Sequence, residues 1–216
     1  RSINNLFLYG LKKNIIAYEN SVYGNIAVSK ESGQSTIFYD GLAAVSIPAP
    51  EAYFTEDFVH LALLTKPGAK KALFVGNAVA GLLTEALKYP LKEVVNVELD
   101  PVFIKTILSL KDPEIKKEIK DPRVHIIVID ARSYIKSAKE KFDCIFVNTG
   151  LPTSLAINRY YTQEFFREVK NTLRKDGIAI FKTWGSLSYL SDESKKINAS
   201  LLVTLKNVFA YVEVIP

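Results

Sequence analysis

The sequence has no methionine, only one cysteine and only two histidines among its 216 residues. A single thiol cannot form an intrachain disulfide, and Cys144 sits in the apolar run Phe142–Val147, which indicates a small core residue. His60 and His125 have no metal-ligand spacing with each other or with this cysteine, so we expect no metal site. Because a natural reading frame begins with methionine, we expect the chain to be a piece of a longer protein.

Long hydrophobic runs and clustered charge are also missing. No apolar stretch approaches the roughly 18 residues that a membrane-spanning helix needs. The net charge of +5 is modest, and the basic residues are not grouped with aromatic ones, which argues against nucleic-acid binding. The densest charged segment, Lys111–Arg123, alternates lysines with Glu114 and Glu118, and is predicted to be a solvated helix face.

Residues 14–47 have the pattern of short β-strands. Apolar and polar side chains alternate around residues 26–28 and 37–39, and the segments ESG and DG supply turn residues between the runs. The two prolines of SIPAP then indicate a linker. We therefore expect a small antiparallel β-domain over residues 1–50.

Strand and helix patterns alternate in the remainder, residues 51–216. The expected strands are Lys71–Val75, Val94–Glu98, Val124–Ile129, Phe142–Val147 and Ile178–Lys182, with a last one near Phe209–Ile215. The expected helices are Leu82–Lys88, Val102–Leu110, Arg132–Ala138, Gln163–Leu173 and Glu193–Lys206. Nearly continuous apolar strands separated by helices are typical of an α/β fold with a mostly parallel sheet and helices on both faces.

The loop after the first of these strands is a candidate ligand site. It reads GNAVAG at residues 76–81, where small side chains let the backbone approach a ligand. The helix that follows is expected to present its free N–H groups there. Gly76 and Gly81 are the binding candidates, and a tight strand-to-helix turn without a ligand is the alternative.

Two acidic residues end the next strands. Glu98 ends the second strand, at the distance along the chain where an acid meets ribose hydroxyls in such folds. Asp130 ends the third strand, where it either accepts from an adenine amino group or caps the following helix. Asp100 precedes a proline and is a good helix N-cap. Together, the loop and the two strand-end acids indicate a nucleoside ligand, as in S-adenosylmethionine-binding folds.

With these residues placed, the chain resembles the polyamine aminopropyltransferase (spermidine synthase) family over nearly its whole length. The matching stretches read YGNIAV, IFYDG, EDFVHLALL, EALKYP, VVNVELDP, DPRVHII, IDAR and KFDCIFV. The most distinctive, LPTSLAINRYYTQEFF, is similar to a divergent subgroup that is often fused to membrane-spanning segments. The resemblance implies a methyltransferase-like Rossmann fold behind a small β-domain, cut before its last strand. It also implies nucleoside binding by Glu98 and Asp130, with Ala131 next in the matched motif.

The departures from the family argue against ordinary aminopropyl transfer. The family's GGGDGG loop reads GNAVAG, so Val79 replaces an acid that helps hold the donor. The acidic motif with the catalytic aspartate reads NTGLP, so Asn148 and Leu151 occupy its acidic positions. Deprotonating an amine with a pKa near 10 needs a positioned base, which these residues do not supply. The catalytic residues are therefore unknown, and Glu56, which matches the family's Tyr-His-Glu stretch, is a substrate-binding candidate together with Asn148.

Arg159 is the third substrate-binding candidate. If it faces the site it repels a diamine and favours an acidic group, whereas a structural salt bridge is the alternative. We expect a domain that binds methylthioadenosine, S-adenosylmethionine or its decarboxylated form and needs no other cofactor. An active aminopropyl- or methyl-type transferase with a non-diamine acceptor and a purely structural or oligomerisation domain are the alternatives. The resemblance further implies a homodimer or homotetramer in the cytoplasm, with a membrane domain elsewhere in the full-length chain.

Overall fold

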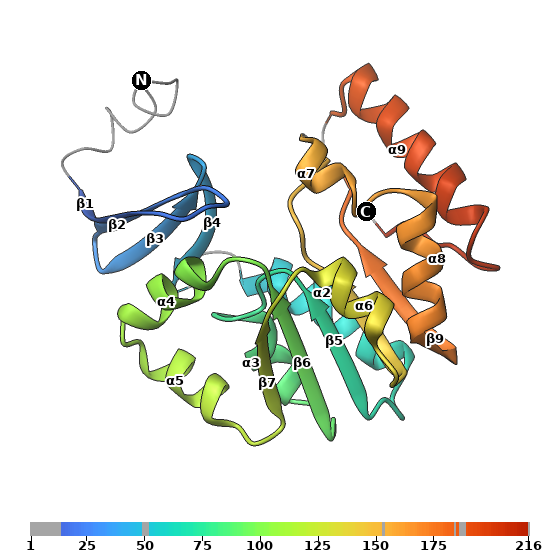
Figure 1. Cartoon of the computed structure of the whole chain (residues 1–216), viewed down its shortest axis with the longest axis horizontal. Helices are drawn as coiled ribbons and strands as arrows, with labels where there is room; N and C mark the ends of the chain where they lie inside the picture. The colour runs from blue at the N-terminus through green and yellow to red at the C-terminus, as the bar shows by residue number, and fades with distance from the viewer. Residues whose placement is uncertain (1–13, 49–51, 153, 184, 186–188, 216) are drawn as a thin grey trace.

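The computed structural model describes residues 14–48, 52–152, 154–183, 185 and 189–215, and these form two β-sheets (Figure 1). The first sheet has four strands in the order β1-β2-β3-β4, and the second has five in the order β7-β6-β5-β8-β9. The expected boundary between residues 50 and 51 lies outside the described residues.

The small sheet is an antiparallel meander, as predicted. Its strands are β1 (Ile15–Asn20), β2 (Asn25–Glu31), β3 (Gln34–Tyr39) and β4 (Leu42–Ile47). The turns between β2 and β3 and between β3 and β4 place Ser32-Gly33 and Asp40-Gly41 at positive φ. Two consecutive residues at positive φ match the right-handed twist of the flanking strands, so these turns fix the hairpin register.

The large sheet is parallel throughout, which confirms the predicted α/β fold. Its strands are β5 (Lys71–Val75), β6 (Glu93–Glu98), β7 (Val124–Val128), β8 (Phe142–Val147) and β9 (Leu173–Phe181). Alternate residues of β5 enter two separate cores: Ala72 and Phe74 face one, and Leu73 and Val75 the other. Burial on both faces explains why these strands are apolar at nearly every position.

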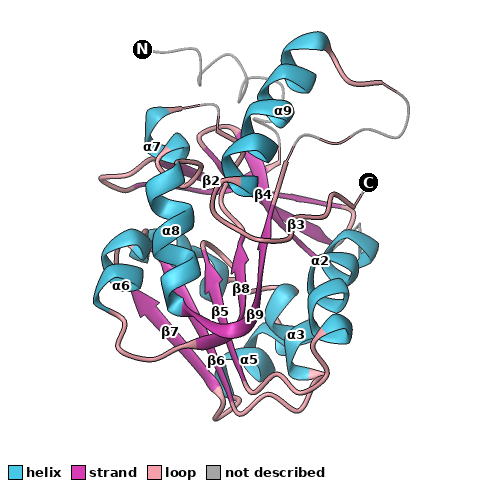
Figure 2. Cartoon of the chain, turned by 90° about the vertical axis from the view of Figure 1, so that its right-hand side faces the viewer, coloured by secondary structure: helices cyan, strands magenta, loops and turns pink. Residues whose placement is uncertain are grey.

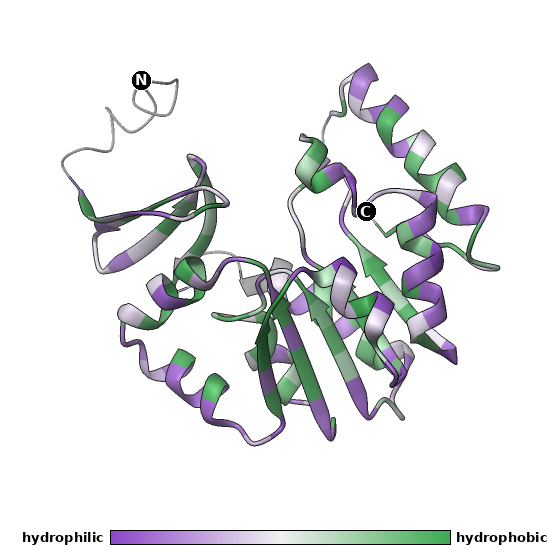
Figure 3. Cartoon of the chain, in the orientation of Figure 1, coloured by the Kyte–Doolittle hydropathy of each residue, from purple (hydrophilic) through white to green (hydrophobic). Residues whose placement is uncertain are grey.

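Helices cover both faces of the large sheet. Figure 2 shows α2 (Ala52–Thr65) and α3 (Leu82–Leu87) on one side and α6 (Ala131–Ser137) and α8 (Gln163–Thr172) on the other. The first core also contains residues of α4 (Pro101–Ser109) and α5 (Pro113–Lys120), and the second core those of α9 (Asp192–Lys206). A short helix, α7 (Leu155–Asn158), precedes α8. Hydrophobic residues concentrate on the central strands, whereas the helices are mixed (Figure 3).

One predicted element is wrong. Residues 209–215 follow α9 but form no strand, and Tyr211, Val214 and Ile215 are exposed. A strand exists only where its backbone N–H and C=O groups pair with a neighbour, and no strand of the described chain pairs with this segment. Within the described ranges, no helix combines the length and the hydropathy needed to cross a membrane.

Candidate functional site

The carboxyl ends of four strands bring the sequence-predicted residues to one edge of the large sheet. The backbone N–H of Gly76 donates to Val97 O (2.9 Å), and the N–H of Asn148 donates to Val75 O (2.8 Å). Likewise, the N–H of Ile129 donates to Glu98 O (3.0 Å). These bonds place the loops after β5, β6, β7 and β8 side by side, where open parallel sheets bind their ligands.

The glycine-containing loop after β5 is held rigidly. Gly76 adopts φ +84°, and a Cβ there would lie 2.6 Å from Asn148 O. The buried amide of Asn96 donates to Gly76 O (2.6 Å), and the Asn148 amide donates to Asn77 O. Asn96 was missed by sequence analysis, although a polar residue inside the apolar run VVNVE is the signal that marks it. The loop is therefore fixed before any ligand arrives.

We expect Gly76→Ala to lower the free energy of unfolding by about 2 kcal/mol, because it combines left-handed backbone strain with a clash against a backbone carbonyl. Urea unfolding measures the loss. Gly33→Ala is the matched control, since Gly33 has φ +85° but open space around its Cβ position, and should cost about 1 kcal/mol. Equal losses in the two variants would show that the contact with Asn148 does not matter.

Three backbone N–H groups around the start of the helix after this loop are already hydrogen-bonded. Glu118 of α5 accepts hydrogen bonds from the backbone N–H groups of Ala80 (2.8 Å), Gly81 (2.9 Å) and Thr84 (3.1 Å). The prediction of a solvated face is wrong for Glu118, which is only 2% exposed. Burial raises its pKa, and the hydrogen bonds oppose that rise. The amides at the start of α3 and the Glu118 carboxylate can both be buried because each is the hydrogen-bond partner of the other. Burying either group without a partner would be costly.

Glu98 is presented for an interaction beyond the sheet. Its Oε1 accepts from the N–H groups of Leu99 (2.8 Å) and Asp100 (3.0 Å). Burial raises the pKa of Glu98, and these two backbone bonds oppose the rise. Its Oε2 accepts no bond from the described part of the chain. The carboxylate is therefore oriented by one oxygen and available through the other.

Asp130 and Arg159 contact each other. Asp130 caps α6 through the N–H of Ser133 (2.9 Å), which is one of the two interpretations left open by the sequence. The Arg159 guanidinium binds both oxygens of Asp130, at 3.0 and 3.1 Å, and lies over the Tyr160 ring. Arg159 thus makes the salt bridge that was its alternative role. Ala131, directly after Asp130, is buried at the start of α6.

The positions expected to bind a substrate carry little negative charge at this edge. Asn148 lies beside Gly76, and its Oδ1 is buried without a hydrogen-bond donor among the described residues. Val79 is buried in the first core. Glu56 is exposed on α2, within electrostatic reach of Lys88 at the end of α3.

Lys182 is a further residue at this edge that sequence analysis did not single out. It follows β9, and the pairing of Val147 with Phe181 places it alongside Asn148. Its ammonium lies 5.5 Å from the centre of the Phe58 ring, and burial lowers its pKa to about 8. A lysine at the carboxyl end of an apolar strand was the available signal. The register therefore brings a lysine to the same edge of the sheet as Asn148.

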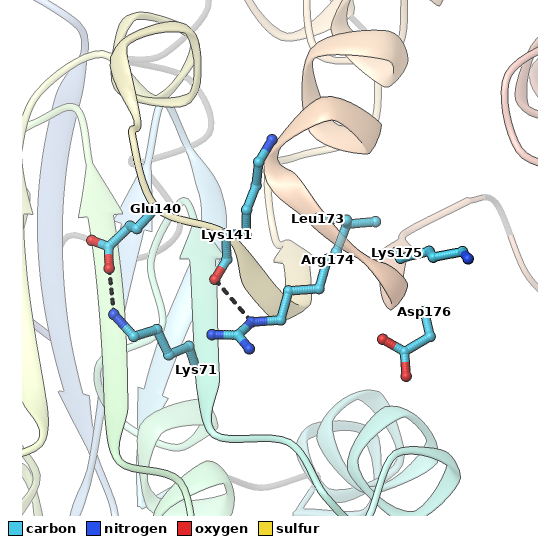
Figure 4. Close-up of a pocket in the computed structure, with 7 residues that line it drawn as sticks. All are labelled: Lys71, Glu140, Lys141, Leu173, Arg174, Lys175 and Asp176. Carbon is cyan, nitrogen blue, oxygen red and sulfur yellow. Dashed lines mark hydrogen bonds and ion pairs between the residues drawn. The ribbon is translucent and has the colours of Figure 1, made fainter.

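A separate hollow of about 670 Å³ opens at the opposite, amino-terminal edge of the sheet (Figure 4). Its charged residues are mostly paired: Lys71 binds Glu140 and Glu93, and Arg174 binds Asp143. Asp143 also accepts from the N–H groups of Lys70 (2.8 Å) and Lys71 (2.9 Å). These contacts tie the strand starts together, so we assign this edge to stability rather than to ligand chemistry.

Comparison with known proteins gives consistent results. The spermine/spermidine synthase domain matches residues 51–216. The polyamine aminopropyltransferase of Korarchaeum cryptofilum (strain OPF8) is 30% identical over 175 residues, which are 80% of this chain and 54% of that protein. Polyamine aminopropyltransferase 2 of Aquifex aeolicus (strain VF5) is 29% identical over 201 residues, 91% of this chain and 39% of that protein. The chain thus spans about half the length of the first relative and less of the second.

Solved structures share the fold. Spermidine synthase from Thermotoga maritima superposes with a TM-score of 0.76 at 21% identity, covering 92% of this chain and 64% of that one. A spermidine synthase in complex with the transition-state analogue AdoDATO gives a TM-score of 0.75 with the same identity and coverage. At this identity the likeness describes the backbone arrangement and not the identity of the side chains at the site.

Proposed function

Because this chain belongs to the spermine/spermidine synthase domain family, we propose that it binds an S-adenosyl-type nucleoside at the carboxyl ends of β5, β6 and β7. Methylthioadenosine, S-adenosylmethionine and its decarboxylated form are the ligands of this class. The observation that carries the proposal is the orientation of Glu98, with Oε1 fixed by two backbone N–H groups and Oε2 left to accept.

The chemistry of each group suits one part of a nucleoside. A carboxylate oxygen has lone pairs for adjacent ribose hydroxyls, which are neutral donors that a glutamate recognises without a counter-ion. Asp130 Oδ1 already accepts from the N–H and the hydroxyl of Ser133 and from Arg159, so the acceptor capacity for an adenine amino group is on Oδ2, which also binds Arg159 at 3.0 Å. Glu118 takes three amides around the start of α3, so a phosphate would have to displace a buried carboxylate to bind there.

We expect isothermal titration with methylthioadenosine to give saturable binding, weakened about tenfold by Glu98→Gln, since a charge-assisted hydrogen bond is replaced by a neutral one. Glu114→Gln is the matched control, because Glu114 is an exposed glutamate of α5 and should bind as the unchanged protein does. Absence of heat and of any thermal shift with millimolar nucleoside would contradict the proposal and favour a purely structural domain.

A transferase with a non-diamine acceptor is the second candidate, and Lys182 is the observation that favours it. A cation beside Asn148 opposes a diamine and suits an acceptor with a carboxylate or another anionic group. The relatives are longer than this chain. Any activity of the whole protein therefore belongs to this second candidate.

A further inference from the structure

The small sheet shares the first hydrophobic core with the large sheet, and one buried carboxylate also joins it by hydrogen bonds to the proposed nucleoside-binding edge. Asp100, at the start of α4, is 1% exposed. Its Oδ2 accepts from Ser21 Oγ in the β1–β2 turn (2.5 Å) and from the Tyr39 hydroxyl at the end of β3 (2.8 Å). Its Oδ1 accepts from the N–H groups of Val102 (2.9 Å) and Phe103 (3.4 Å). Two parts of the chain that are far apart in sequence thus share one acceptor group.

Capping of α4 explains only half of this arrangement. A helix N-cap uses one carboxylate oxygen to accept from the first amides of the helix. At an exposed cap, water molecules donate to the other oxygen. Here both hydroxyls of the small sheet replace that water, because a buried carboxylate without donors is costly. The Tyr39 ring also packs edge-on against Phe103 at 5.4 Å. Burial and the negative charge of Asp100 raise the pKa of Tyr39, so its hydroxyl keeps its proton and donates.

The Tyr39 ring packs against Gly24, where there is no room for a larger side chain. A Cβ on Gly24 would lie 2.6 Å from Cε1 of the Tyr39 ring. Ser21 also accepts from the N–H groups of Tyr23 (3.0 Å) and Gly24 (3.1 Å), which fixes the turn that carries its hydroxyl. The two donors therefore approach Asp100 from a rigid surface.

The same residue orients the ribose candidate. The backbone N–H of Asp100 donates to Glu98 Oε1, next to the bond from Leu99. The Leu99–Asp100 peptide is thus held at two points, by Glu98 through its N–H and by the small sheet through the Asp100 side chain. We propose that Ser21 and Tyr39 are positioning residues for ribose recognition, acting through Asp100 on the Glu98 carboxylate. This inference rests on the proposed nucleoside binding and adds the small sheet to the determinants of affinity.

A positioning role predicts a selective loss. Without the Tyr39 hydroxyl, the Asp100 loop relaxes and the N–H groups that orient Glu98 shift, so the ribose contact weakens. The adenine contact at the end of β7 does not involve this loop. Tyr39→Phe is expected to weaken methylthioadenosine binding about fivefold and to leave its 2′,3′-dideoxy counterpart unchanged, as measured by isothermal titration.

Ser21 provides an independent pair of variants. Ser21→Ala should also weaken the binding of methylthioadenosine and leave the binding of its 2′,3′-dideoxy counterpart unchanged. Ser21→Thr, which keeps the hydroxyl, should retain the affinity for methylthioadenosine. Tyr18→Phe is the matched control, because Tyr18 is a half-exposed tyrosine of β1 in the same sheet. The Ser21 pair carries the test if Tyr39→Phe fails to fold.

Each outcome has a defined meaning. Selective loss with the ribose ligand supports the positioning role. Equal losses with both ligands indicate a merely structural contact and overturn it, as does unchanged affinity in Tyr39→Phe and Ser21→Ala. Absence of nucleoside binding in the unchanged protein overturns the proposed function itself, and is recognised because it appears before any substitution is made.

Discussion

Replacing Glu118 by alanine is expected to lower the free energy of unfolding by about 4 kcal/mol. The substitution removes the acceptor for three backbone N–H groups, those of Ala80, Gly81 and Thr84, at the start of α3. A buried donor left without a partner costs about 1–3 kcal/mol, and water entering the adjoining cavity of about 190 Å³ offsets part of the sum. Urea unfolding followed by circular dichroism measures the change.

Two further variants separate the causes. Glu118→Gln keeps one acceptor oxygen but turns an amide donor toward the N–H groups, so we expect a loss of about 2 kcal/mol. Glu114→Ala removes an exposed carboxylate from the same helix, and its effect should stay within about 0.5 kcal/mol. If all three variants unfold at the same urea concentration, the carboxylate of Glu118 does not stabilise the loop.

The protein is expected to form no spermidine from putrescine and decarboxylated S-adenosylmethionine. Putrescine is a dication whose amine must lose a proton before it attacks, and a positioned base contributes about 10²–10⁴ to such a step. The family resemblance implies that Asn148 and Leu151 occupy acidic positions of the family, and neither side chain is a base.

Chromatographic detection of spermidine and methylthioadenosine is the measurement. The Thermotoga maritima spermidine synthase, which shares the fold, serves as the active control under the same conditions. Spermidine formation at a rate comparable with that control would show that another group acts as the base. The result is informative together with nucleoside titration, because binding without turnover separates a ligand-binding domain from an aminopropyltransferase.

The fold was largely predictable because each of its elements has a local signal. The continuous apolar runs Lys71–Val75 and Phe142–Val147 became β5 and β8 with the expected bounds, since strands buried on both faces admit few polar residues. Asp100 caps α4 as its position before a proline indicated. The strand expected near Phe209–Ile215 failed because a strand also needs a neighbour, which residue patterns alone do not show.

Only those candidate site residues that lie at the carboxyl ends of the parallel strands could be predicted from the sequence. The position of Glu98, Asp130 and Gly76 at one edge of the sheet was predictable because parallel strands bring their carboxyl ends together. Glu118 was wrongly predicted to be solvent-exposed. The alternation of charges indicates a helix but gives no sign that Glu118 binds backbone amides up to 38 residues earlier in the chain. The contact of Asp100 with Ser21 and Tyr39 spans 79 and 61 residues and has no local signature. Contacts between distant side chains are therefore the part that required the structure.

The pairing of β5 with β8 has a consequence for how the chain reaches its final form. Ala72 pairs with Cys144, so the centre of the large sheet closes a loop of about 70 residues, whereas each hairpin of the small sheet closes only a short turn. Local pairings form quickly and distant parallel ones slowly, because the entropy of the long loop is lost before any contact compensates for it. We therefore expect the hairpins of the small sheet to form before the pairing of β5 with β8 is complete. In that order, the hairpins already hold the hydroxyls of Ser21 and Tyr39 when the start of α4 docks against them.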